Sequence, residues 1–141
     1  MLRHIALRVR ALHEAGYVHC NLSPEAFKWY PRENLWMLCE FGHAARAGDA
    51  RRAGPGGLSD TKITYAAPEG VAIDDRTESL RLRNDVVAKV GLDVWSYAVV
   101  ALEIMFGLPL LDSSNEAEVR ATVHGGYMVL RFVGTFFLDI G

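Results

Sequence analysis

The sequence predicts an α+β fold that is mainly helical, and three patterns carry the prediction. Apolar residues recur at helical spacing over residues 2–14. Two short aromatic and aliphatic runs, 27–30 and 35–38, flank a turn signal and indicate a β-hairpin. Residues 93–106 are apolar almost all round, which is typical of a buried helix. The chain of 141 residues is long enough for one domain with a modest core.

The elements follow one another in a simple order. The N-terminal helix should bury four residues of one face: Leu2, Ile5, Val9 and Leu12. Gly16 is its expected stop, and residues 17–26 form a loop. The hairpin turns at residues 31–34, where proline and asparagine favour a turn.

The second half of the chain is less regular. Residues 43–62 are rich in Gly, Ala and Arg, so we expect a flexible loop. Residues 70–92 carry many charges of both signs and read as an exposed insertion, with a partial helix as one option. The buried helix should end at Gly107. Residues 126–141 form a divergent apolar tail, shorter than the roughly 20 residues of a membrane span.

Composition is that of an ordinary globular protein, with 50% hydrophobic and 23% charged residues. The net charge of −2 gives no reason to expect nucleic acid or a membrane as partner. Two cysteines are too few for a disulfide framework, so we expect an intracellular, cytoplasmic protein.

Four short motifs occur in a fixed order along the chain. They are His19-Cys20-Asn21-Leu22-Ser23-Pro24-Glu25-Ala26, Glu40-Phe41-Gly42, Tyr65-Ala66-Ala67-Pro68-Glu69 and Asp93-Val94-Trp95-Ser96-Tyr97. Each motif alone is weak evidence. Together they resemble the catalytic loop, the D-F-G motif, the A-P-E motif and the following helix of protein kinases. The resemblance covers residues 1–125 and implies a partial kinase-like C-terminal lobe: helix, catalytic loop, short β-hairpin, activation segment (43–62) and buried helix.

The resemblance also implies which chemistry has changed. Kinases carry a catalytic Asp at the position of Asn21 and a magnesium-binding Asn at the position of Ala26. A neutral amide is too weak a base, and alanine has no ligand atom. Glu40 keeps a carboxylate at the other metal position, where displaced metal binding and an ordinary solvated or salt-bridged side chain both stay open.

Two further loop positions differ from the kinase pattern. Cys20 replaces an arginine that pairs with a phosphorylated activation segment in many kinases, and a thiol cannot form that ion pair. A reactive thiol next to His19 is conceivable, but a structural role for Cys20 is favoured. Ser23 replaces a lysine that contacts the transferring phosphate.

Other kinase-like residues are retained, and the resemblance gives them structural roles. Asp93 should accept hydrogen bonds from the loop backbone near Cys20, and Trp95 should lie on the buried helix. Glu69 pairs with an arginine of a later helix in kinases, and that helix is expected beyond residue 141.

Three functions remain open from the sequence. The first is a catalytically impaired, pseudokinase-type binding or scaffold module. The second is a fragment of a divergent serine/threonine kinase that transfers phosphate from ATP within a longer chain. The third is a truncated product without independent function. Because no Gly-rich loop or strand lysine is recognised, the upper lobe is expected to be absent. No cofactor is predicted, although the family uses ATP and Mg²⁺, and a protein partner or self-association is expected.

Overall fold

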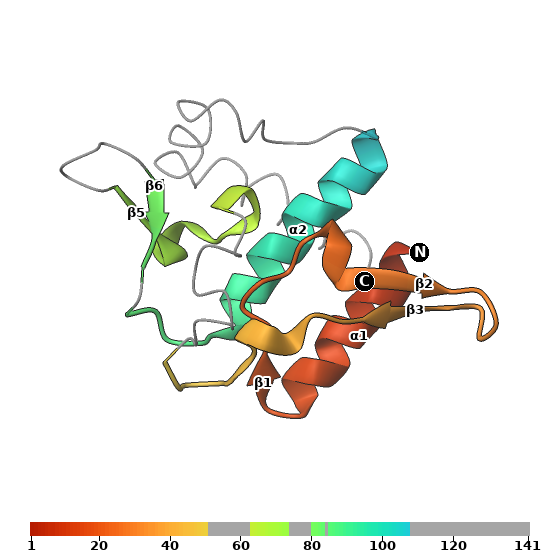
Figure 1. Ribbon diagram of the computed structural model, residues 1–141, viewed down its shortest axis with the longest axis horizontal. Helices are drawn as coiled ribbons and strands as arrows, with labels where there is room; N and C mark the ends of the chain where they lie inside the picture. The colour runs from red at the N-terminus through yellow and green to blue at the C-terminus, as the bar shows by residue number, and fades with distance from the viewer. Residues whose placement is uncertain (51–62, 74–79, 84, 108–141) are drawn as a thin grey trace, which may run out of the picture.

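The fold is known from a computed structural model that describes residues 1–50, 63–73, 80–83 and 85–107, without the side chains of 72, 73, 80 and 81. The described residues form two long helices, and Figure 1 shows a β-hairpin projecting to one side of them. The helices are α1 (Leu2–Glu14) and α2 (Val90–Phe106). The strands are β1 (Tyr17–Val18), β2 (Phe27–Tyr30), β3 (Leu35–Leu38), β4 (Ala45–Arg46), β5 (Val71–Ile73) and β6 (Leu80–Leu82). Short 3₁₀ turns within the described residues are η1 (Pro24–Ala26), η2 (Phe41–His43), η4 (Ile63–Tyr65) and η5 (Pro68–Gly70).

Helix α1 has the predicted bounds. Ile5 and Val9 are buried on its inner face, and Leu2 and Leu12 pack beside them. The helix ends before Gly16, whose φ of +83° is a conformation that glycine adopts at little cost.

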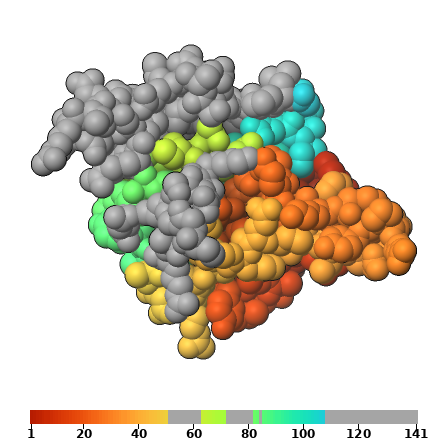
Figure 2. All heavy atoms as spheres, viewed as in Figure 1, coloured from red at the N-terminus to blue at the C-terminus, as the bar shows by residue number. Residues whose placement is uncertain are grey.

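The hairpin of β2 and β3 is also confirmed. The strands are antiparallel, with Phe27 opposite Leu38 and Trp29 opposite Trp36. Phe27 and Leu38 are buried where the hairpin meets the body, and the rest projects outward in Figure 2. Side chains alternate between the two faces of a strand, so the hairpin face that carries Phe27 and Leu38 is the face turned toward the core.

Helix α2 begins three residues earlier than predicted, at Val90, and is only partly buried. Its side chains from Leu92 to Ala101 are buried apart from Val94, which is 50% exposed. The last turn is open, with Met105 at 49% and Phe106 at 60% exposure. The prediction of a helix buried along its whole length was therefore wrong for this turn, because the residues that α2 contributes to the core end at Ala101.

The core forms two clusters that α2 joins. The first lies between α1, the hairpin and α2: Ile5, Val9, Leu22, Ala26, Phe27, Leu38, Tyr97, Val100 and Ala101. The second lies on the other side of α2: Val18, Cys20, Ala45, Ala67, Val86, Ala88, Leu92, Trp95 and Val99. The loop after β1 contributes to both clusters, so it is anchored from two sides.

Residues 70–92 differ from the expected exposed, partly helical insertion. Strands β5 and β6 form an antiparallel hairpin, and Leu82, Val86 and Ala88 are buried. Ala88 exchanges backbone hydrogen bonds with residues 48 and 49, at 2.9 and 2.8 Å. The charges between these apolar residues suggested solvent exposure, but pairing with a distant segment determines the structure.

Some expectations fall outside the described residues: most of the loop 43–62, from 51 onward, and the tail 126–141. The described start of that loop includes β4, which pairs with β1. Among the described helices, none has both the length and the apolar character needed to cross a membrane.

Candidate functional site

The centre of the candidate site is Asp93, a fully buried carboxylate in the first turn of α2. Its Oδ2 accepts a hydrogen bond from the backbone N–H of His19 at 2.7 Å. Its Oδ1 accepts one from the N–H of Cys20 at 2.8 Å. Both donors lie in the loop after β1, where unpaired N–H groups would be costly. Asp93 therefore fixes the backbone of the catalytic-loop-like segment to α2.

A third partner of Asp93 was not foreseen from the sequence. His13, in the last turn of α1, places its Nε2 2.8 Å from Oδ2 of Asp93. His13 follows Ile5 and Val9 at intervals of four, so it lies on the buried face of α1. A polar residue on an apolar helical face is the signal that would have identified it. The three contacts tie α1, the loop and α2 together.

His19 links the loop to the Glu40-Phe41-Gly42 motif. Its Nε2 lies 2.8 Å from the carbonyl oxygen of Cys39, an acceptor only, so Nε2 carries the proton. Nδ1 is buried and has no hydrogen-bond partner among the described residues. Burial lowers the pKa of the imidazole below its usual 6.5, against the opposing effects of the Cys39 bond and Asp93. The ring of Phe41 lies 5.4 Å from the imidazole.

The segment from Cys20 to Ala26 contains the positions that differ from the kinase pattern. Asn21 is half-buried, and the carbonyl oxygen of buried Ala26 accepts a hydrogen bond from the N–H of Cys39 at 2.8 Å. Ser23 donates through Oγ to Glu25 at 2.9 Å. The Cys20 thiol is buried and contacts the Val18 carbonyl at 3.6 Å. Cys20 belongs to the second core cluster, and its structural role stays a prediction.

Glu40 lies on the surface, at the entrance to η2. Its φ of +65° places it in the left-handed region, and its Oε1 lies 3.2 Å from Nζ of Lys28. Both side chains are about half exposed, at 47% and 52%. The structure thus shows the salt-bridged state of Glu40. Such an exposed pair contributes about 0.2–1 kcal/mol.

The Tyr65–Glu69 motif rests on α2. Tyr65 donates its hydroxyl to Glu103 at 2.9 Å, and Ser96 donates to the Tyr65 carbonyl at 2.6 Å. Burial, with Glu103 beside it, raises the pKa of Tyr65. Glu69 is exposed, and its carboxylate lies near Gly91 in the first turn of α2. Trp95 is buried in the second core cluster. The described side chains include no group of three His, Cys, Asp or Glu residues arranged to hold a metal ion.

Comparisons with known proteins agree with this geometry. No family model matches the chain. The serine/threonine-protein kinase Kist of Mus musculus is 27% identical over 129 residues, covering 86% of this chain and 28% of Kist. The citron Rho-interacting kinase of Homo sapiens is 25% identical over 146 residues, covering 99% of this chain and 7% of that kinase. The chain thus spans less than a third of either relative.

A solved structure supports the same fold. The kinase PK-1 of the Cydia pomonella granulovirus superimposes with a TM-score of 0.58 at 19% identity. The match covers 84% of this chain and 39% of PK-1. The order of α1, loop, hairpin and α2 therefore corresponds to part of a kinase fold. The chain is thus similar in sequence to protein kinases and shares part of their fold.

Proposed function

We propose that this chain is a catalytically impaired kinase-like domain that works as a pseudokinase-type module for binding or scaffolding. One observation carries the proposal. Asp93 holds the loop backbone through His19 and Cys20, while the base position of that loop is Asn21 and the metal position is Ala26. The architecture of the site is kept and its chemical groups are replaced.

The chemistry argues against efficient phosphoryl transfer. Kinases use a carboxylate to accept the proton of the substrate hydroxyl, and Asn21 is neutral. Losing a general base costs about 10²–10⁴ in rate. Mg²⁺ needs near-octahedral oxygen coordination, which Ala26 cannot supply. The remaining carboxylate, Glu40, is paired with the Lys28 ammonium.

The retained contacts favour a binding role. Burying a carboxylate costs desolvation free energy unless hydrogen-bond partners surround it. Asp93 has three such partners, the N–H groups of His19 and Cys20 and the His13 ring. These contacts hold the loop in one conformation, although the loop carries Asn21 and Ala26 in place of the catalytic base and the metal ligand of kinases. A protein partner or self-association belongs to the same proposal, as does an intracellular setting, which kinship with protein kinases supports.

The alternative is phosphoryl transfer by a divergent serine/threonine kinase, of which this sequence is a part. Glu40 is the observation in its favour, because its side chain is 47% exposed and its carboxylate is within reach of solvent ions. An exposed ion pair with Lys28 is weak enough to exchange for another cation.

An assay with γ-labelled ATP and generic protein substrates tests the proposal. We expect no transfer by the chain and none by the Asn21→Ala variant. Asn34→Ala, in the hairpin turn, is the matched control for replacing an asparagine elsewhere. Transfer that Asn21→Ala or Glu40→Ala abolishes, and Asn34→Ala leaves unchanged, would establish the kinase alternative.

A further inference from the structure

The starting point is the backbone carbonyl of Trp36 in β3. The N–H of Cys39 donates to the carbonyl of Ala26, so residues 26 and 39 form a hydrogen-bonded pair of the ladder. Pairs alternate along antiparallel strands, and the Trp29–Trp36 pair is therefore non-hydrogen-bonded. The carbonyl of Trp36 points away from β2 and needs a partner elsewhere.

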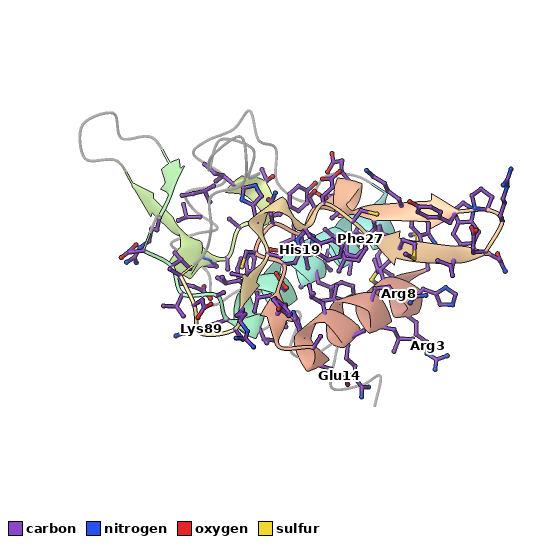
Figure 3. All side chains as sticks on the ribbon, turned by 60° about the horizontal axis from the view of Figure 1, so that its bottom comes forward. Arg3, Arg8, Glu14, His19, Phe27 and Lys89 are labelled. Atoms are coloured by element: carbon purple, nitrogen blue, oxygen red, sulfur yellow. The ribbon has the colours of Figure 1, made fainter. Side chains whose placement is uncertain are left out.

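Arg8 of α1 supplies that partner. Its Nε donates to the Trp36 carbonyl at 3.2 Å, and Figure 3 shows Arg8 on the side of α1 nearest the hairpin. Neither terminal nitrogen of this guanidinium has a partner among the described residues. A guanidinium fixed through Nε presents its other nitrogens as a planar fork, which suits bidentate binding of a carboxylate.

An apolar surface adjoins this fork. The rings of Trp29 and Trp36 lie 5.6 Å apart, and Trp29 is 43% exposed. Both occupy the hairpin face that also carries buried Phe27 and Leu38. Half-exposed tryptophan beside an anchored arginine is the pairing that dominates the energetics of many protein interfaces.

The charge around this corner is positive. Helix α1 carries Arg3, Arg8 and Arg10 against a single acid, Glu14, which pairs with Arg10 at 2.7 Å. His4 lies one turn before Arg8 on the same flank. The nearby hairpin turn adds one charge of each sign. An acidic partner is electrostatically complementary to this corner.

We propose that Arg8, Trp29 and Trp36 form a docking corner for a protein segment that carries a carboxylate beside an apolar side chain. The carboxylate binds the Arg8 fork and the apolar side chain covers Trp29. The proposal goes beyond the proposed function and does not depend on it, because Lys28 and Glu40 lie on the opposite face of the hairpin.

Fluorescence anisotropy with a labelled peptide of alternating glutamate and leucine tests the proposal on the 141-residue chain. We expect binding that weakens about tenfold or more when glutamine replaces glutamate in the peptide. Arg8→Gln and Trp29→Ala should each weaken binding about tenfold. Arg8→Lys keeps the charge but not the fork, and should lose most of the affinity.

Two matched controls separate this corner from general effects. Arg10→Gln removes an arginine from the other flank of α1, and Tyr30→Ala removes an aromatic ring with the same 43% exposure from the opposite hairpin face. Both should change binding less than about twofold. Equal losses in Arg8→Gln and Arg10→Gln, absence of binding, or tighter binding of a phosphoserine–leucine peptide would overturn the proposal. If Trp29→Ala does not fold, Trp29→Leu and Arg8→Lys decide the outcome.

Discussion

Replacing Asp93 with alanine tests how the loop is held. The change leaves the buried N–H groups of His19 and Cys20 without acceptors. Each unpaired buried donor costs about 1–3 kcal/mol, so the loss is about 2–6 kcal/mol before any contribution from His13. Domains of this size are stable by about 5–15 kcal/mol. Asp93→Ala should therefore remove a large part of the folding free energy.

Urea unfolding followed by tryptophan fluorescence measures this loss. With an m value of about 1.5 kcal/mol/M, the midpoint should fall by at least about 1 M. Glu40→Ala is the matched control, because it removes an exposed carboxylate that contributes about 0.2–1 kcal/mol through Lys28. Asp93→Asn keeps one acceptor oxygen, so its urea midpoint should lie between those of Asp93→Ala and Glu40→Ala. Equal midpoints for Asp93→Ala and Glu40→Ala would refute the assigned role of Asp93.

Three further predictions follow from the same contacts. Because burial lowers the pKa of His19, the unfolded state takes up a proton first as the pH falls below 6.5, so stability is full above that pH and declines below it. Unfolding midpoints from pH 8 to 5 should show this decline, and His19→Gln should reduce it. The triple variant Asn21→Asp, Ala26→Asn, Glu40→Asp should still transfer no phosphate from labelled ATP, because Ser23 leaves the loop without the positive charge that contacts the phosphate; turnover would show that the three residues suffice. Exposed Trp29, Met105 and Phe106 should cause concentration-dependent self-association in light scattering, and a monodisperse monomer would contradict this expectation.

Local patterns predicted the elements whose contacts are close in sequence. Helix α1 and the β2–β3 hairpin have the expected bounds, because side-chain spacing and a turn determine them. The strands in 70–92 were missed, since β5 and β6 depend on pairing with each other and residues 87 and 88 pair with residues 48–50. In that region, charged neighbours in the sequence interrupt the apolar pattern, so the burial of Leu82, Val86 and Ala88 was not predicted.

The site shows the same division. Motif order pointed to Asp93 and the loop, because those residues are recognisable in sequence. His13 and Lys28 come from other elements and meet Asp93 and Glu40 only in the folded chain. No local pattern indicates which carboxylate a distant side chain will contact. The contacts of Asp93 with His13 and of Glu40 with Lys28 are therefore visible only in the folded structure.

The most direct test of the central claim is thermal unfolding of the chain with and without Mg·ATP. The claim is that the loop is held in place while the groups that bind and use a metal-bound nucleotide are replaced at Asn21 and Ala26. Binding at 100 times Kd would add about 2.7 kcal/mol, which corresponds to a Tm increase of about 5–10 °C. The account predicts no increase at millimolar Mg·ATP. A clear increase that Glu40→Ala removes would contradict it.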